Sequence, residues 1–164
     1  MDSELTPGCG PFRPETFFAG RTEGWGLARG PTGRLLRRCH VTTDGRQDQA
    51  YRSIHFSETI RWDDGEQDVW RWAMTRGLDG RYMAAEARVG SGIEGRHDGE
   101  DYLLSFRRPL RVDGGPRPRY VTRLTQISPG VAVKSETIFL WGLPVGRLTA
   151  FYRRTEGPES MFPA

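Results

Sequence analysis

Asp-Gly dipeptides separate short extended segments along much of this chain, and this pattern constrains the fold more than any other feature. The three that read as tight turns begin at positions 44, 64 and 79, between runs in which polar and apolar residues alternate. Asp-Gly is a strong hairpin signal because both turn residues need a positive φ. No window of eleven or more residues shows a convincing period of 3.6. The sequence therefore predicts an all-β, antiparallel and almost helix-free chain.

Turn signals every ten to fifteen residues predict eight or nine strands in up-and-down order. Closing such a sheet into a lipocalin-like or calycin-like barrel removes its two edges, and a two-sheet sandwich is the main alternative. We expect a leader over residues 1–11 that is mobile, one barrel domain over 12–154 and a tail over 155–164. The expected strands are 17–29, 34–43, 51–63, 67–75, 81–90, 102–108, 120–127, 131–141 and 148–153, with the Gly/Asp-rich residues 91–99 as a connection.

Composition and charge exclude several classes of function. The net charge is only +3, and Arg alternates with acidic residues except over the basic stretch Arg107–Arg123, so no nucleic-acid interface is predicted. No run approaches the roughly 20 apolar residues that span a bilayer, and residues 1–10 lack a secretory signal. Cys9 and Cys39 read as free thiols of a cytoplasmic protein. The three histidines lack ligand spacing, so neither a metal nor a cofactor is expected.

Hairpin register predicts which side chains share a face of the sheet. If each Asp-Gly pair is a two-residue loop, Glu58 faces Arg71 across one hairpin and Arg88 lies beside Arg71 across the next. One face then holds Ile54, Phe56, Glu58, Ile60, Val69, Arg71, Ala73, Glu86 and Arg88, and the other His55, Ser57, Thr59, Arg61, Trp70, Trp72 and Met74. We expect the first face inside the barrel. The tryptophans favour the opposite, and a one-residue slip in either hairpin reverses the assignment.

The order of several short motifs resembles that of DUF3833-type proteins, an uncharacterised bacterial family. The motifs are Phe17–Gly20, Glu23–Gly26, Glu58, Asp63–Glu66 and Trp70–Trp72. The resemblance covers roughly residues 12–154 and implies a lipocalin-like barrel without an assigned reaction. Many members look like exported lipoproteins, whereas this chain shows no signal peptide or lipid-attachment motif. An acidic, Trp-containing segment expected near residues 118–126 is also missing.

A carboxylate facing a guanidinium is the sharpest candidate for chemistry. In a partly dry barrel Glu58 would stay ionised beside Arg71, and could hold a polar ligand group or act as a base. A buried ion-pair network that merely fixes register is the alternative. The tryptophans are candidate cavity walls or ordinary core, and Trp25 is expected as a barrel plug. The candidate ligand-binding residues are Trp25, Phe56, Glu58, Arg71, Glu86, Arg88, Tyr102 and Tyr120, of which Glu58 and Arg71 are the catalytic pair if the protein is an enzyme.

The predicted barrel interior suggests two functions from different classes. A third function is also open, in which the interior is filled. The first is a carrier or sensor that holds a small apolar molecule with an acidic group in the barrel. The second is a cofactor-free isomerase, cyclase or lyase that uses Glu58 as base and Arg71 as anion stabiliser. The third is an interaction domain with a plugged barrel and Arg107–Arg123 as its contact surface. A small hydrophobic or amphipathic molecule is the expected partner, with a homodimer as a further option.

Overall fold

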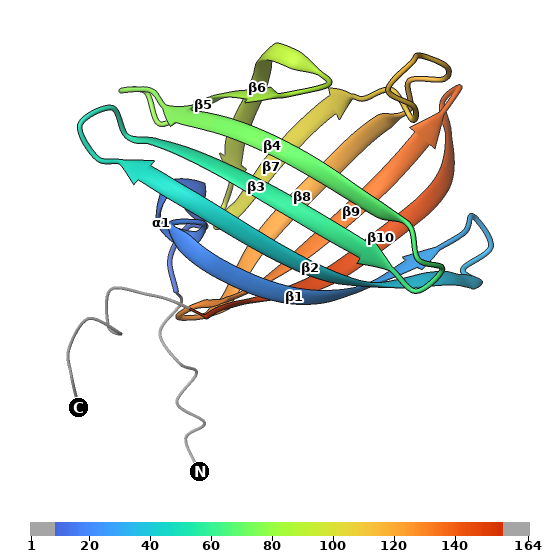
Figure 1. Ribbon diagram of the computed structural model, residues 1–164. Helices are drawn as coiled ribbons and strands as arrows, with labels where there is room; N and C mark the ends of the chain where they lie inside the picture. Colours follow the sequence, from blue (N-terminus) through green and yellow to red (C-terminus); the bar gives the residue numbers. More distant parts are fainter. Residues whose placement is uncertain (1–8, 156–164) are drawn as a thin grey trace.

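The computed structural model describes residues 9–155, which form a closed barrel of ten antiparallel strands and one short helix (Figure 1). Each strand pairs with its neighbours in sequence, and the first strand pairs with the last. The all-β, lipocalin-like expectation is confirmed, with one strand more than the upper expected number. The elements are α1 (Pro14–Phe17), β1 (Gly20–Arg29), β2 (Leu35–Asp48), β3 (Ser53–Trp62), β4 (Gln67–Arg76), β5 (Tyr82–Glu86), β6 (Gly90–Asp98), β7 (Asp101–Arg107), β8 (Arg119–Ser128), β9 (Val131–Leu140) and β10 (Leu143–Arg154).

The additional strand is β6, which occupies the stretch that the sequence suggested was a connection. Its pattern Gly90-Ser91-Gly92-Ile93 is poor in β-forming residues, but β5 and β7 flank it on both sides and supply its ladder partners. Pairing in the tertiary structure outweighs the weak intrinsic preference of such residues. Most of the expected leader and tail, residues 1–8 and 156–164, lies outside the described residues.

The helix α1 closes one end of the barrel. Pro14 stands in its first turn, where the missing N–H costs nothing, and Gly20, the first residue of β1, has a φ of +88°. Phe12, Phe17 and Phe18 are buried there, and the Phe12 carbonyl contacts the His97 ring nitrogen at 2.7 Å. Three aromatic rings thus fill the barrel end next to α1, which we call the closed end. The opposite end, at the β3–β4 and β7–β8 connections, is the open end (Figure 1).

The register of β4 corrects the predicted face. Glu58 pairs with Trp70 and Ser57 with Arg71, one residue away from the expected alignment. The reason is the turn: the amide of Gly65 bonds the Trp62 carbonyl, and Gly65 itself adopts a φ of +89°. This turn is followed by a bulge at glycine, so the loop holds three residues instead of two.

The shifted register reverses which side chains of β4 face the barrel interior. Trp70, Trp72 and Met74 point inward and are buried, whereas Arg71 is exposed on the outer surface. The strand β4 is also displaced by one residue against β5, where Trp72 pairs with Glu86. The β3 residues Ile54, Phe56, Glu58 and Ile60 are buried as expected. The two slips of one residue cancel between β3 and β5, so Glu86 on β5 is buried as expected as well. The predicted placement of Val69, Arg71 and Ala73 in the interior is wrong.

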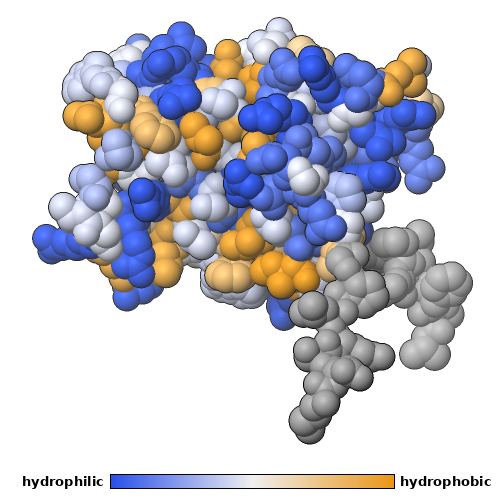
Figure 2. Space-filling model, turned by 180° about the vertical axis from the view of Figure 1, so that it is seen from behind, coloured by the Kyte–Doolittle hydropathy of each residue, from blue (hydrophilic) through white to orange (hydrophobic). Residues whose placement is uncertain are grey.

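The first Asp-Gly pair is not a turn. Asp44 and Gly45 lie within β2, which continues to Asp48. Gly45 serves packing instead, because a methyl group at this position would collide with the carbonyl oxygen of Phe18 at the end of α1. The glycine therefore allows the helix to approach the sheet closely. From behind, the outer surface of the barrel shows hydrophilic and hydrophobic residues interspersed (Figure 2).

Candidate functional site

A cavity of about 700 Å³ lies at the open end of the barrel. Its volume is within the range of small-molecule pockets. Inward-facing side chains of five strands supply its apolar wall, and exposed Leu36, Leu110 and Val112 extend that wall to the rim. The wall residues on the strands are Ile60, Trp70, Tyr120, Ile138 and Leu148. The arrangement therefore leaves an apolar interior that is reached from the open end.

Two arginines at this cavity have no acidic partner in the described part of the chain. Six arginines and three carboxylates line it: the arginines are Arg29, Arg37, Arg88, Arg108, Arg111 and Arg147, and the acids Glu66, Asp68 and Glu136. Four of the arginines form salt bridges, and three of these reach acids outside the lining, Asp64, Glu86 and Asp113, so six acids in all offset the six arginines. Arg29 and Arg147 have no acidic partner within residues 9–155, and they are register neighbours on β1 and β10. Both are exposed and share the outward parity of Leu27 and Thr149, so this pair offers uncompensated positive charge on the outer rim of the cavity.

Arg108 joins the separate strand ends at the open end. Its guanidinium is 2% exposed, contacts Glu86 through Nε at 3.3 Å and Asp68 through Nη1 at 3.0 Å, and donates to the Val69 carbonyl at 3.1 Å. The same group lies 3.4 Å above the centre of the Trp70 ring. The hairpin β5–β6 is short here, so Arg108 links the end of β7 to β4 where ladder hydrogen bonds stop. We call this group the Arg108 clasp.

Both carboxylate oxygens of Glu86 accept hydrogen bonds within the clasp. Its carboxylate accepts hydrogen bonds from the amides of Arg88 at 2.8 Å and Val89 at 3.2 Å, besides the guanidinium of Arg108. A carboxylate with these partners caps the turn after β5. Arg88 reaches Asp68 at 3.1 Å and lies at the cavity mouth. Glu86 therefore holds the turn and the clasp in place.

Deeper in the barrel, Glu58 meets a lysine and a tyrosine. The Lys134 ammonium lies 3.3 Å from one Glu58 oxygen, and the Tyr152 hydroxyl donates to the other at 2.8 Å. Glu136 lies 3.9 Å from the same ammonium and accepts a hydrogen bond of 2.6 Å from Thr122. All of these residues are at least nine-tenths buried. The partner of Glu58 is thus the single lysine of the chain, and the expected Glu58–Arg71 pair does not exist.

The protonation states of this cluster follow from burial and mutual charge. Burial lowers the pKa of Lys134, but the charge of Glu58, followed by Tyr152 and Glu136, outweighs it, so the pKa lies well above its usual value. Burial and then the charge of Glu58 raise the pKa of Tyr152 well above its ordinary value. Lys134 is therefore a permanent cation and not a nucleophile at neutral pH. The cluster is a saturated ion network.

The predicted site residues are distributed over several regions. Arg88 and Tyr120 line the open-end cavity, and Phe56 and Glu58 line a small inner void of about 30 Å³ next to it. Tyr102 is buried at the closed end beside Tyr82, and Glu86 belongs to the clasp. Trp25 is half-exposed on the outer surface against His40, so its expected role as a plug is wrong. Arg71 lies outside the barrel.

Sequence reasoning missed three important inward-facing residues. Lys134 and Glu136 share the parity of Ala132 on β9, but the valines at 131 and 133 suggest the opposite face. Arg108 lies beyond the end of β7 and has no periodic signal. The one available signal was that Lys134 is the only lysine in a chain rich in arginine.

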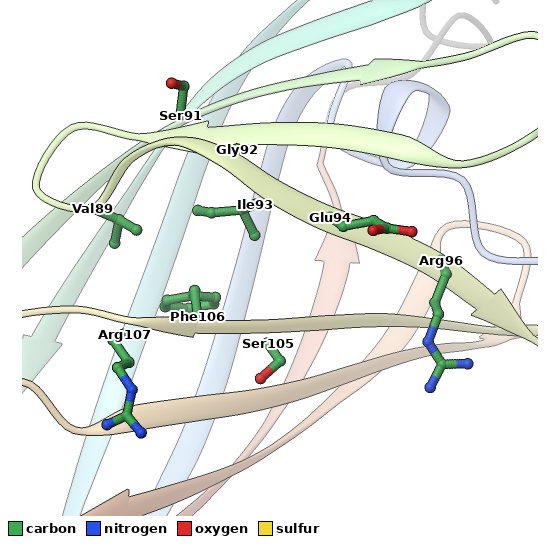
Figure 3. A pocket seen from close by; sticks show the side chains of 9 residues that line it. All are labelled: Val89, Ser91, Gly92, Ile93, Glu94, Arg96, Ser105, Phe106 and Arg107. Carbon is green, nitrogen blue, oxygen red and sulfur yellow. The ribbon is translucent and has the colours of Figure 1, made fainter.

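A second depression, of about 540 Å³, lies on the side of the barrel between β6 and β7. The ladder between these strands stops at the pair Gly95 and Leu104, and beyond it the strands diverge. Figure 3 shows Val89, Ile93 and Phe106 in the space between them, with Glu94 and Arg96 further along β6. Phe106 stacks on Tyr120 and contacts Trp70 edge-on, so its ring lies between this depression and the cavity.

The described part of the chain contains neither a cluster of metal-ligand side chains nor a membrane-spanning helix. Within residues 9–155 no group of three or more His, Cys, Asp or Glu side chains could hold a metal ion. In the same residues no helix is long and apolar enough to cross a membrane. Both cysteines are free.

Comparison with protein families identifies the chain. The model of DUF3833, described as a protein of unknown function, matches residues 7–154. The chain belongs to the DUF3833 family. No curated protein matches this DUF3833 member in sequence. Among solved structures it is similar to the S-type phycobiliprotein lyase CPES from Guillardia theta, with a TM-score of 0.62 and 12% identity over 86% of this chain and 90% of that one. This likeness shows a shared fold.

Proposed function

We propose that this DUF3833 protein binds a small amphipathic molecule in the open-end cavity, with the ligand's apolar body inside and an anionic group at the mouth. The cavity of about 700 Å³ with apolar walls, and with Arg29 and Arg147 at its rim without an acidic partner in the described part of the chain, is the observation that carries the proposal. A closed barrel of this size has room for one small ligand. The same fold serves a phycobiliprotein lyase, and this likeness supports the proposal at the level of the fold.

Two other functions are less well supported. A plugged interaction domain fits the closed end, where α1 fills the barrel, but not the open end. An enzyme that uses Glu58 as base would need an Arg71 partner, and Glu58 is bound instead to Lys134 and Tyr152. We therefore propose binding rather than catalysis.

Titration with a fluorescent anionic amphiphile, anilinonaphthalene sulfonate, tests the proposal, with dodecanoate and dodecanol as competitors. We expect saturable binding, and dodecanoate should displace the probe at lower concentration than dodecanol. Replacing Arg29 and Arg147 together with glutamine should weaken dodecanoate binding roughly two- to fivefold per charge, as for exposed ion pairs, and leave dodecanol unchanged. Arg61→Gln, at an exposed position of β3 that lines neither the cavity nor the depression between β6 and β7, is the matched control. Equal effects on both competitors, or no displacement, would contradict the proposal.

A further inference from the structure

Three loops of the open end lie next to one another on one side of the barrel. The sheet places β2, β1, β10, β9, β8 and β7 side by side, so the β1–β2, β9–β10 and β7–β8 loops follow in that order around the opening, at the end opposite α1 (Figure 1). We call residues 29–36, 110–119 and 141–147 of these loops the apolar–basic sector. The acidic β3–β4 turn lies beyond β2, outside this sector.

Large apolar side chains are exposed on the apolar–basic sector. Each of five is more than half exposed: Leu36, Leu110, Val112, Trp141 and Leu143. The first three of these also line the open-end cavity, so the apolar surface of the cavity wall continues onto the outside of the sector. Exposed apolar side chains gathered in this way around an opening mark an interaction surface.

Trp141 occupies a backbone position that is unfavourable for tryptophan. Leu140 pairs with Leu143, so Trp141 and Gly142 form a two-residue hairpin loop, in which their φ angles are +51° and +78°. A loop with two positive φ angles is typical of a type I′ turn, which favours Asn-Gly, and a bulky residue there is an outlier. The Trp141 side chain is 86% exposed, so burial does not compensate for this conformation. An exposed indole held at the tip of a strained turn indicates a function at that tip.

The charge of the apolar–basic sector is strongly positive. Its residues include six arginines and a single acid, Asp113, which pairs with Arg111. The other five arginines have no acidic partner within residues 9–155; they are Arg29, Arg34, Arg117, Arg119 and Arg147. Arginines beside a protruding tryptophan and aliphatic side chains match the interface of an anionic bilayer, where indoles lie at the level of the head groups and each cation is attracted to the surface.

We propose that the apolar–basic sector docks onto the surface of an anionic lipid bilayer. Trp141, Leu143 and Val112 enter the interfacial region, and the unpaired arginines contact the lipid phosphates. Docking of this peripheral kind needs no membrane-spanning segment. It places the mouth of the open-end cavity against the lipid, so that an amphipathic ligand passes directly between bilayer and barrel. The inference goes beyond the proposed binding function, because docking needs no bound ligand and is tested without one.

Co-sedimentation of the full chain with vesicles tests the proposal. One set of vesicles contains phosphatidylglycerol and phosphatidylcholine, and the other contains phosphatidylcholine alone. We expect binding to the anionic set, much weaker binding to the neutral set, and release from the anionic set as salt is added. Phosphatidylcholine with brominated acyl chains, added to the anionic set, should quench the fluorescence of Trp141.

Trp141→Asn separates docking from folding. It creates the Asn-Gly pair that a type I′ turn favours, so the turn is retained while the indole is removed. We expect vesicle affinity to fall roughly tenfold, as the loss of a partly buried aromatic side chain requires, and quenching by brominated lipid to be lost. Tyr51→Asn is the matched control, since Tyr51 is an exposed aromatic residue in the β2–β3 connection at the closed end, and it should bind vesicles as the full chain does.

A second variant tests the charge. Arg34→Gln, Arg117→Gln and Arg119→Gln together should weaken binding to anionic vesicles roughly fivefold per charge, about 100-fold in all. The same substitution at three exposed arginines outside the sector is the control and should have little effect; these are Arg46, Arg81 and Arg96. None of the residues changed in either variant lines the cavity, so their affinity for anilinonaphthalene sulfonate should be unchanged.

Three results would overturn the docking proposal. The first is that the full chain binds neither set of vesicles, and the second is that both sector variants bind the anionic set as the full chain does. The third is self-association without lipid, measured by sedimentation velocity and abolished by Trp141→Asn, since the sector would then be an interface between two copies of the chain. Vesicle binding by a chain that fails to bind anilinonaphthalene sulfonate would support docking and refute the proposed function alone.

Discussion

At the scale of single residues, the barrel interior shows how charge is retained away from water. Burying an isolated ammonium is strongly unfavourable, and Lys134 is tolerated because two carboxylates and a phenol surround it. The same partners explain why Glu58 is unsuited to act as a base, since both of its oxygens already accept hydrogen bonds. Burial of a carboxylate is therefore no evidence of catalysis here.

The buried tyrosines lead us to predict how the free energy of unfolding changes at alkaline pH. The pKa of Tyr120 is raised from its usual 10.0 to about 12 by burial and by Glu136, and that of Tyr152 is raised as well. Below pH 10 these phenols are protonated in both states. Above it the unfolded chain loses protons that the folded chain keeps, so the free energy of unfolding should fall as pH rises from about 10 towards 12.

Urea unfolding at a series of alkaline pH values, with tyrosinate absorbance recorded in parallel, checks this expectation. Tyr120→Phe removes one of the groups and should make the decline shallower, whereas Tyr51→Phe, at an exposed position, should leave its slope unchanged. A free energy of unfolding that is constant over this pH range would contradict the assigned burial of the tyrosines.

At the scale of elements, one side chain, that of Arg108, connects the strands of the open end beyond the point where the β4–β5 ladder ends. Hairpin β5–β6 is short, and the Arg108 clasp connects β7 with β4 across it. Arg108→Leu leaves Glu86 buried without its cation, so we expect the free energy of unfolding to fall by about 3–5 kcal/mol. Chemical denaturation at neutral pH measures this change.

Arg107→Leu is the matched control for the clasp, because Arg107 is exposed and, within residues 9–155, donates only to the Arg117 carbonyl. Its effect should stay within about 0.5 kcal/mol. Adding Glu86→Gln to Arg108→Leu should restore part of the loss, since the unpaired charge is then absent. Equal destabilisation by the two arginine substitutions would show that the clasp does not hold the open end.

At the scale of the whole molecule, the two ends of the barrel are different. Phe12, Phe17 and Phe18 fill the closed end around α1, whereas the open end retains a cavity of about 700 Å³. Filling the cavity should therefore abolish ligand binding without unfolding the barrel. Ile138→Trp, on the cavity wall, should reduce probe affinity at least tenfold by our order-of-magnitude estimate of lost volume.

Titration with anilinonaphthalene sulfonate measures the effect of Ile138→Trp, and a thermal melt confirms that the variant folds. Thr149→Trp is the control, since Thr149 is exposed on the outer face of β10. It should bind the probe as the unsubstituted chain does. Unchanged affinity in a folded Ile138→Trp variant would place the bound probe elsewhere, for example in the depression between β6 and β7.

The sequence by itself determined the class of fold. Alternation along β3, the turn residues at Asp64-Gly65 and Asp79-Gly80, and the order of motifs shared with DUF3833 proteins all predict an antiparallel barrel, and the barrel is confirmed. These signals are local, since they depend on turn chemistry and on period-two burial within one strand. Local signals also placed Glu58, Ile54 and Ile60 correctly in the interior.

Only the tertiary structure decided which residues meet in the interior. The bulge at Gly65 moved Arg71 outside and brought Trp70 inside, because one extra loop residue reverses a whole strand. The meeting of Glu58 with Lys134 and Tyr152 joins strands separated by 76 and 94 residues. Such contacts arise from closure of the barrel, which brings together side chains whose proximity no local pattern encodes. The cavity is therefore a property of the closed sheet rather than of any segment.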